Sequence, residues 1–551
     1  MSTDEVSKAL WRQAEDRLRQ GDLTSAAPAL ERALAVAPNA IGFRNLAVVR
    51  FQLKQPQMAL TACNAALKLS PLDHDAFGMR GDILFALDRF ADAIESYREA
   101  TRLQPSFAQA WANMGVALLR LGQSKKALMA SEHAFRLAPD RPAFAIQYGT
   151  LLVSEKRFSD GRTVLEYALQ NIDPTFEVAQ SLFAACHGVG DPSAALRWLD
   201  AALKLKPNDA NTEYNRGIIL TELGQVDDAL AAYRNAASLD PSNPEPAWNA
   251  SLLLLRTGQW KQAWPLFESR LRRSTRKDYG TAINAIPRWS GEAASDRKRI
   301  LLLAEQGLGD TLMFCRYAPL IAERGYEVSI LAQASLRTLL SRARGIDRVC
   351  DEQLNPGDFD YRIELMSLPG IFDTREDTIP FSDEPYIFAD PERIKQWRVK
   401  LNRAKRPLAG LMWRGRKNPW LTERSISLGE LTTKLPKNLS YISLQKSLLP
   451  DELSVAASFN LETHDGSEVD LEDAAAIIQL VDLVITIDTS IAHLAGALGA
   501  KTLLLLPENP DWRWTDFGEE SPWYYKIRIF RFAADGAWRT LQKRIASLLE
   551  K

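Results

Sequence analysis

The sequence of 551 residues predicts an all-α repeat solenoid followed by two α/β lobes. Three observations predict this fold class. Small residues and prolines recur with a period of 34 in the first half, and the second half alternates apolar strand-like runs with helical patterns. One of those runs ends in a glycine turn that carries a single acid. A chain of this length exceeds one hydrophobic core, so several domains are expected.

The repeats are defined by three ladders in one register. The first ladder consists of Ala33, Ala66, Ala100, Ala134, Ala168, Ala202 and Ala236. A second stands seven residues earlier, at Ala26, Ala59, Ala93, Ala127, Gly161, Ala195 and Ala229, and a third stands five residues later, at Pro38, Pro71, Pro105, Pro139, Pro207 and Pro241. Small residues let two helices approach closely, and a proline ends the second helix of a unit. The pattern resembles the tetratricopeptide repeat, with another helical array as the alternative.

We therefore expect a tetratricopeptide-repeat solenoid over residues 1–275, with about seven repeats and a partial eighth. Such solenoids present a concave surface that binds peptides or proteins. A basic run closes the array and consists of Arg270, Arg272, Arg273, Arg276 and Lys277. It is expected to be a solvated face, and contact with a phosphate is the alternative.

Strands and helices alternate after a linker at 276–298. The first lobe, 299–390, is expected to hold strands at 300–304, 326–331, 347–350 and 359–365, with helices at about 311–323 and 335–343. The second lobe, 391–551, is expected to hold strands at 407–413, 439–444, 483–488 and 501–506, with a helix at 471–481. Two Rossmann-like lobes of this size predict a ligand cleft between them.

The first strand of the first lobe leads into the turn Gly307-Leu-Gly309-Asp310, and a helix is expected from Thr311. Ligands of open parallel sheets lie at the carboxyl ends of strands, so Asp310 is placed where chemistry can happen. The alternative is that Asp310 only caps the helix. Leu312 stands where a third glycine of a dinucleotide fingerprint would be, so a dinucleotide site is not supported.

A second informative stretch runs from Asp488 to His493, directly after a buried strand. Thr489 or Ser490 can cap the following helix, whose free N–H groups and positive dipole end favour a phosphate. His493 lies in the first helical turn, within reach of a bound anion. The alternative is a capped structural helix with His493 satisfied in the core.

The two stretches together resemble the heptosyltransferase-like branch of the GT-B glycosyltransferases. The tail is similar to that group as well, in the segments 506–514, 521–525 and 528–531. With the repeats in front, the chain resembles bacterial tetratricopeptide-repeat glycosyltransferases, some of which modify flagellin, and its plan is similar to that of protein O-GlcNAc transferases.

The resemblance implies that Asp310 is the general base toward an acceptor hydroxyl, and that Asp488, Thr489 and Ser490 hold the donor's phosphate. Cations for the leaving group are expected from the loop after Trp413. The further donor-side candidates are Arg414, Arg416, Lys417, Arg424, Gln445 and Lys446, each with a solvated surface as the alternative. Trp512, Trp514 and Trp523 are expected to be core rather than a sugar platform.

Composition and charge exclude several classes of function. A formal net charge of −1 gives no electrostatic case for nucleic acid, and no stretch approaches the ~18 apolar residues of a membrane span. The four scattered cysteines and an N-terminus without signal-peptide features predict a cytoplasmic protein. No DxD pair predicts a metal, and no cofactor is expected beyond the nucleotide sugar as substrate.

We therefore predict a metal-independent glycosyltransferase that moves a sugar to a Ser or Thr hydroxyl of a protein captured by the repeats, with flagellin as a candidate. The alternatives are a heptosyltransferase-like enzyme acting on a glycan or lipid-linked acceptor, and a non-catalytic repeat scaffold. The sugar, the nucleotide and the oligomeric state stay open.

Overall fold

The computed structural model describes residues 3–170, 172–275, 277–415, 425–464, 470–507, 510–515, 518–532 and 538–550. The chain forms two compact units, Met1–Ala232 and Tyr233–Lys551. This division falls before the expected border at 275–276. The helices of the partial eighth repeat therefore belong to the same unit as the α/β part.

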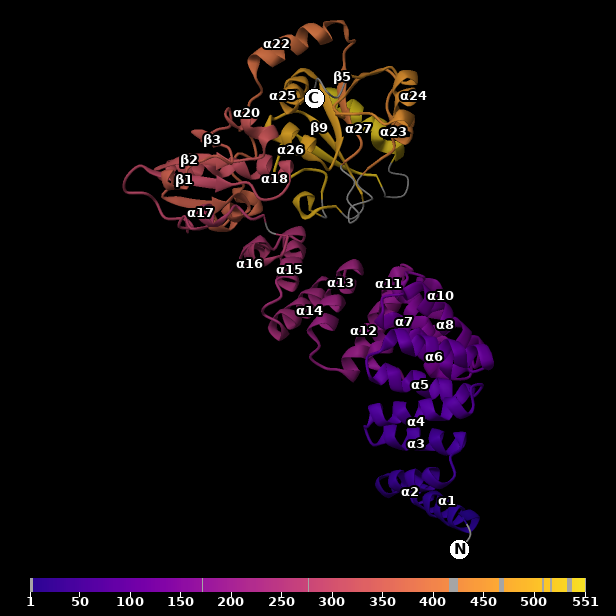
Figure 1. Cartoon of the computed structure of the whole chain (residues 1–551). Coiled ribbons are helices and arrows are strands. Elements are labelled where there is room, and N and C mark those ends of the chain that lie inside the picture. Colours follow the sequence, from indigo (N-terminus) through magenta and orange to yellow (C-terminus); the bar gives the residue numbers. More distant parts are fainter. Residues whose placement is uncertain are drawn as a thin grey trace. The chain divides into compact units, whose positions relative to one another are not determined.

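The first unit is built of antiparallel helix pairs that follow one another along the chain (Figure 1). Their bounds are α1 Thr3–Arg19, α2 Leu23–Val36, α3 Ala40–Gln52, α4 Pro56–Leu69, α5 His74–Ala86, α6 Phe90–Leu103, α7 Ala108–Arg120, α8 Ser124–Leu137, α9 Pro142–Ser154, α10 Phe158–Ala168, α11 Phe176–Gly188, α12 Pro192–Leu205 and α13 Ala210–Glu222. Helix α14, Val226–Leu239, crosses into the second unit. The all-α solenoid predicted from the ladders is confirmed.

The ladders have direct structural causes. Every alanine of the first ladder is at most 4% exposed, as expected where two helices pack closely. The second helices end two residues before the ladder prolines, for example α2 at Val36 before Pro38 and α4 at Leu69 before Pro71. At Gly161, which replaces alanine in the fifth unit, an added Cβ would lie 2.6 Å from Cγ2 of Val153, so the packing there leaves no room even for alanine.

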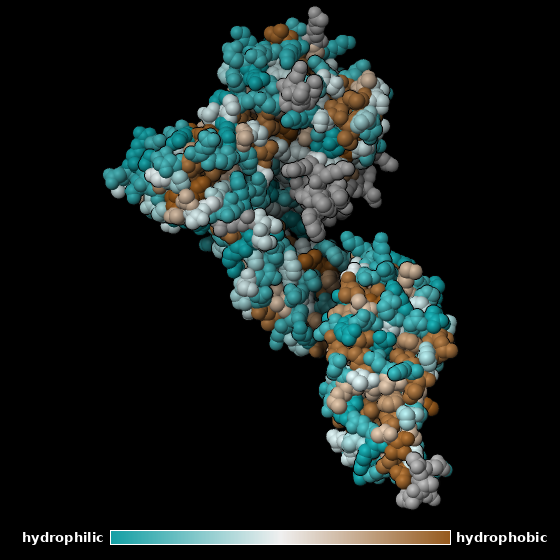
Figure 2. All heavy atoms as spheres, viewed as in Figure 1, coloured by the Kyte–Doolittle hydropathy of each residue, from teal (hydrophilic) through white to brown (hydrophobic). Residues whose placement is uncertain are grey.

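On the face seen in Figure 2, the repeat unit shows a mixture of hydrophilic and apolar residues. Exposed apolar side chains in this unit include Ile41, Leu72 and Met129. All four cysteines of the chain are buried free thiols, and burial raises the pKa of Cys63 and of Cys315 to about 12. None of the described helices is both long enough and apolar enough to span a bilayer.

The first lobe of the second unit is a parallel sheet in the order β3-β2-β1-β4. Its strands are β1 Lys298–Leu303, β2 Tyr326–Leu331, β3 Arg348–Cys350 and β4 Tyr361–Glu364. The central strand β1 is apolar and fully buried from Ile300 to Leu303, which is typical of a parallel strand covered on both faces. The accompanying helices are α17 Thr281–Asn284, α18 Leu308–Phe314, α19 Ala318–Glu323, α20 Arg337–Leu340 and α21 Leu368–Ile371.

The second lobe is a six-stranded parallel sheet in the order β10-β9-β8-β5-β6-β7. Its strands are β5 Leu408–Met412, β6 Ser440–Ser443, β7 Leu461–Glu462, β8 Leu483–Ile487, β9 Thr502–Leu506 and β10 Ile527–Arg531. Its helices are α22 Pro391–Lys400, α23 Leu428–Lys434, α24 Pro450–Ser458, α25 Leu471–Leu480, α26 Ser490–Ala497 and α27 Trp538–Glu550. The chain runs outward from β5 on one side and from β8 on the other, so the strand order reverses between these two strands. The two α/β lobes predicted from the sequence are confirmed.

The helices of the partial eighth repeat, α15 Glu245–Arg256 and α16 Trp260–Phe267, pack on the lobes. The indole N–H of Trp264 donates to the carbonyl of Thr374 at 2.7 Å, and Trp260 stacks on Trp523 with ring centroids 5.1 Å apart. The expected linker is packed too: Trp289 is 1% exposed, and its backbone N–H donates to the carbonyl of Arg362. This segment packs on the first lobe and is not an extended linker between domains.

The basic run that closes the array is only partly a solvated face: Arg272 and Lys277 are exposed, whereas Arg270 is buried. Arg270 is 4% exposed and pairs with both Glu268 and Glu305. Arg272 donates to the carbonyl of Pro241, and Arg273 pairs with Glu245. Arg276 lies outside the described residues. The expectation of a solvated run is wrong for Arg270, because its guanidinium neutralises the buried carboxylate of Glu305.

Candidate functional site

The carboxyl ends of β5 and β8 define the candidate site in the second lobe. Because both strands are parallel and hydrogen-bonded, the segments that follow them leave from one edge of the sheet. A Cβ added at Gly415, after β5, would lie 3.7 Å from Cγ2 of Thr489, after β8. Ligands of doubly wound sheets bind where the strand order reverses, and this is that place.

The segment after β8 is arranged as predicted for a helix start. Asp488 is 8% exposed and directly follows the buried strand β8. Thr489 is the N-cap of α26, and its hydroxyl accepts from the N–H of Ile491 at 3.3 Å. Ser490 is the first residue of this helix and is half-buried. The cap and the dipole end of α26 thus lie at the carboxyl edge.

Asp310 lies at the N-terminus of α18, which begins at Leu308 and not at Thr311 as predicted. Gly307 is the N-cap, and its backbone N–H donates to Oδ2 of Asp310 at 2.9 Å. The other carboxylate oxygen, Oδ1, accepts from Nη2 of Arg513. Asp310 therefore caps its helix, as one alternative held, and also contacts a cation of the second lobe.

Helices α18 and α26 pack directly on each other, so the two predicted stretches meet. Gly309 is a point of close approach, because a Cβ there would lie 2.6 Å from Cδ2 of His493. His493 is 4% exposed, its Nδ1 is 3.0 Å from the hydroxyl of Tyr524, and its ring stacks on Trp514 at 5.1 Å. This burial favours a structural histidine over one that touches a bound anion.

Arg513 is a site residue that the sequence reasoning missed. It lies in the 3-10 helix Trp512–Trp514 after β9 and pairs with Asp511 at 2.7 Å as well as with Asp310. Burial by itself would lower the pKa of Arg513, but the carboxylates of Asp310 and Asp511, with a further contribution from Asp488, raise it above its ordinary value. The available signal was one cation within the tail 506–514; its partner is 203 residues away.

Arg316, which the sequence also does not predict as a site residue, forms hydrogen bonds with residues of both lobes. It is fully buried, and its guanidinium donates to the carbonyl of Trp523 and to the hydroxyl of Tyr386, both at 2.8 Å. The guanidinium also lies over the ring of Tyr524 at 4.7 Å. Trp512, Trp514 and Trp523 are at most 5% exposed, which confirms that they are core.

The predicted donor-side residues after β5 and β6 differ in their burial and in their partners. Arg414 pairs with Glu452 at 3.1 Å, so a buried carboxylate already offsets its charge. Gln445 is 7% exposed and accepts from the backbone N–H of Arg414 at 3.2 Å, and Lys446 is exposed. Burial would raise the pKa of Glu452, but hydrogen bonds from Arg414, Leu449 and Trp413 lower it below its ordinary value. Arg416, Lys417 and Arg424 lie outside the described residues.

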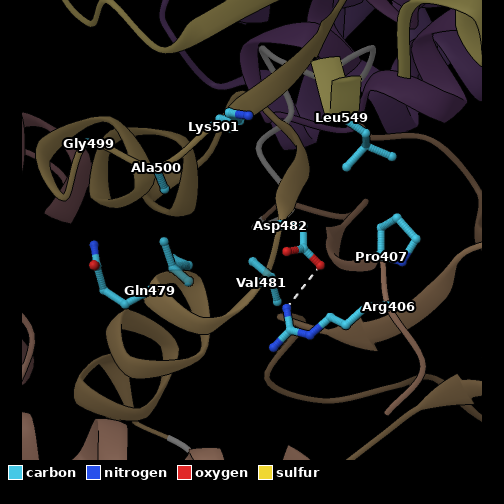
Figure 3. Close-up of a pocket in the computed structure, with 10 residues that line it drawn as sticks. Arg406, Pro407, Gln479, Val481, Asp482, Gly499, Ala500, Lys501 and Leu549 are labelled. Atoms are coloured by element: carbon cyan, nitrogen blue, oxygen red, sulfur yellow. Dashed lines mark hydrogen bonds and ion pairs between the residues drawn. The ribbon is translucent and has the colours of Figure 1, made fainter. Parts of the chain in front are cut away.

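A separate pocket lies at the opposite edge of the second sheet (Figure 3). It is lined by residues that precede β5, β8 and β9, including Pro407, Asp482 and Lys501, and Arg406 pairs there with Asp482 at 2.9 Å. Amino ends of parallel strands lie away from the edge where ligands of such sheets bind. Among the described residues, no cluster of His, Cys, Asp and Glu side chains is arranged to hold a metal ion.

Replacing Gly309 with alanine is expected to lower the free energy of unfolding of the second unit by about 1–3 kcal/mol, the usual cost of overpacking. The added methyl would push α18 away from His493 on α26. The matched control is Gly429→Ala in α23, where a Cβ meets nothing within 4 Å. Urea unfolding followed by tryptophan fluorescence measures both, and equal stability of the two variants would contradict the close packing of α18 on α26.

Comparison with known proteins agrees with this architecture. Residues 466–534 match glycosyltransferase family 9 (heptosyltransferase). Residues 12–74, 188–244 and 214–278 match the tetratricopeptide repeat, and residues 81–122 match a further repeat family. The family 9 match covers α25, β8, α26, β9 and the segment with Arg513, so it includes the helix start after β8.

Among the relatives, the protein FlbA of Caulobacter vibrioides is 27% identical, over 94% of this chain and 92% of that protein. The human protein O-mannosyl-transferase TMTC1 is 32% identical over 22% of this chain and 14% of its own length. The solved structure of Pseudomonas aeruginosa PilF covers 38% of this chain at 21% identity and a TM-score of 0.34. The chain thus joins tetratricopeptide repeats to a glycosyltransferase family 9 domain.

Proposed function

We propose that this chain of tetratricopeptide repeats and a glycosyltransferase family 9 domain transfers a sugar from a nucleotide-sugar donor to a Ser or Thr hydroxyl of a protein, with flagellin as a candidate acceptor. The observation that carries the proposal is that α18, which holds Asp310, packs on the first turn of α26, with Gly309 against His493. Sugar transfer needs a carboxylate that can remove the acceptor's proton and, close to it, a helix N-terminus that can bind the donor's phosphate.

In the proposed reaction, the acceptor oxygen attacks the anomeric carbon of the sugar. The bond from that carbon to the donor's phosphate oxygen breaks, and the nucleotide leaves with the electron pair. Asp310 takes the hydroxyl proton, which avoids a positively charged acceptor oxygen. The dipole end of α26 with Thr489 and Ser490 stabilises the charge on the leaving nucleotide without a metal, in a GT-B arrangement in the cytoplasm.

A protein acceptor is supported by the repeat unit. A pocket there spans three successive first helices, α3, α5 and α7, and includes Asn45, Asp82 and Asn113. Asp82 accepts from Tyr97 and from Asn113, both at 2.7 Å, and burial raises the pKa of Asp82. The side-chain amides of Asn45 and Asn113 lie on the repeats before and after the one that carries Asp82. Such amides suit an extended peptide, since they can donate to and accept from its backbone.

The matched family is glycosyltransferase family 9 (heptosyltransferase), which favours a glycan or lipid-linked acceptor as the second candidate. One experiment separates the two. The purified chain is incubated with a panel of nucleotide sugars. In one set of reactions the acceptors are flagellin and other candidate proteins, and in the other set they are lipid-linked glycans. The masses of the products are measured by mass spectrometry. Transfer to protein supports the proposal, and transfer to the glycan alone replaces it. Absence of both transfer and calorimetric nucleotide binding would leave a non-catalytic scaffold.

A further inference from the structure

Both oxygens of the Asp310 carboxylate are held, and by different parts of the chain. Oδ2 accepts from the backbone N–H of Gly307 within α18, and Oδ1 accepts from Arg513 of the second lobe. The Asp310 side chain is 15% exposed and that of Arg513 is 10% exposed, so water competes little with this pair. A carboxylate fixed at two points presents one defined direction to a substrate.

Arg513 is itself anchored. Its Nη1 pairs with Asp511 at 2.7 Å, and its guanidinium lies over the ring of Trp512 at 4.6 Å. The forked guanidinium thus spans two carboxylates, a geometry that a lysine cannot reproduce.

The ring of Trp512 is in turn held from two sides. Trp264 and Phe267 of α16 meet it edge-on, with centroids at 6.1 and 5.8 Å, and Phe314 of α18 stacks on it at 6.5 Å. The last repeat helix therefore supports the segment that carries Arg513.

We infer that Arg513 is a positioning residue for the proposed transfer: supported by Trp512 and the last repeat helix, it holds Asp310 of the other lobe in the orientation for proton removal. The inference rests on the proposed function, because it gives Arg513 a task only if Asp310 is the base. It also gives the partial eighth repeat a task in the α/β unit, apart from acceptor capture.

The test is a double-mutant cycle on transfer activity. Arg513→Gln is expected to lower kcat by up to about 10²-fold, the scale of a misplaced catalytic group, with KM for the donor little changed. In an Asp310→Asn background the same substitution should lower kcat little further, because its effect passes through Asp310. Arg513→Lys keeps the charge but loses the fork, so its kcat should lie between those of wild type and Arg513→Gln.

Two further measurements separate a positioning role of Arg513 from a structural one. Thermal unfolding is compared for all variants, and Asp511→Asn, which loosens Arg513 without touching Asp310, should lower kcat in the same direction by less. If Arg513→Gln does not fold, the Arg513→Lys and Asp511→Asn variants are carried through the same cycle. Equal losses in the wild-type and Asp310→Asn backgrounds, or an unchanged kcat, would overturn the inference. An inactive wild type would instead reject the proposed function.

Discussion

Replacing Asp310 with asparagine is expected to lower the rate of sugar transfer by about 10²–10⁴-fold, the usual contribution of general-base catalysis. Asparagine keeps the shape and can still accept from the N–H of Gly307, so α18 keeps its cap. It cannot take a proton at neutral pH. The loss should appear in kcat, while nucleotide binding measured by calorimetry stays as in the wild type, because the donor is proposed to sit on α26.

The matched control is Asp482→Asn. Asp482 is also a hydrogen-bonded, ion-paired aspartate: it accepts from the N–H of Leu408 at 2.8 Å and pairs with Arg406. It lies at the amino edge of the second sheet, away from the proposed reaction, so its variant should transfer sugar at the wild-type rate. If Asp310→Asn retains activity within about tenfold of wild type, Asp310 is a helix cap and not a base.

The sequence predicts the elements of this fold well, because each depends on local pattern. The strand expected at 326–331 is β2 to the residue, and the helix expected at 471–481 is α25, Leu471–Leu480. Asp470 and Asp473 explain that helix start: each side chain accepts from the other's backbone N–H, and acids are favoured there. Both signals lie within a few residues of the element they define.

Other features escaped because no local pattern marks them. Strand β7 has two residues, too few for a period to show, and the sequence predicts no strand at β10. The sequence predicts the start of α18 three residues late, because two glycines within four residues indicate a turn, whereas Gly307 is a cap and Gly309 lies in the helix. Glycine is needed there for the approach to His493, a contact made by packing across the two lobes.

The site shows the same limit more strongly. Asp310 and the segment from Asp488 to Ser490 could be singled out, because each follows a recognisable strand. Arg513 could not, since a cation in a tail has no local feature that distinguishes a buried partner from a solvated surface. Arg414 shows the converse: it was placed at the correct strand end, but Glu452, 38 residues later, offsets its charge.

Replacing Arg270 with methionine is expected to lower the free energy of unfolding of the second unit by about 3–5 kcal/mol, the cost of leaving a buried charge without its partner. Arg270 donates to both oxygens of Glu305, at 3.1 and 2.9 Å, and to the hydroxyl of Ser367 at 2.6 Å. The side chain of Glu305 is 9% exposed. Urea unfolding followed by fluorescence reports on this unit, which holds 11 of the 14 tryptophans.

The loss of stability caused by Arg270→Met should depend on pH. Burial raises the pKa of Glu305 even though Arg270 lowers it, so without Arg270 the carboxyl binds its proton more tightly still. A raised pKa in the folded state stabilises the fold below the ordinary carboxyl range and loses that stabilisation as the pH rises through the folded-state value. Arg270→Met should therefore be less destabilised at acidic pH than at pH 8.

Two variants separate a buried charge from a general loss of packing. Arg270→Met combined with Glu305→Gln removes the uncompensated charge and should recover part of the lost stability, because a neutral amide costs less to bury. Arg273→Met, in the same segment, breaks a pair with Glu245 whose side chains are 24% and 33% exposed, and partly exposed pairs contribute about 0–1 kcal/mol. If the Arg273 variant is as destabilised as the Arg270 variant, the buried pair does not join the last repeat to the first lobe. The cations of the basic run would then contribute to stability to a similar extent.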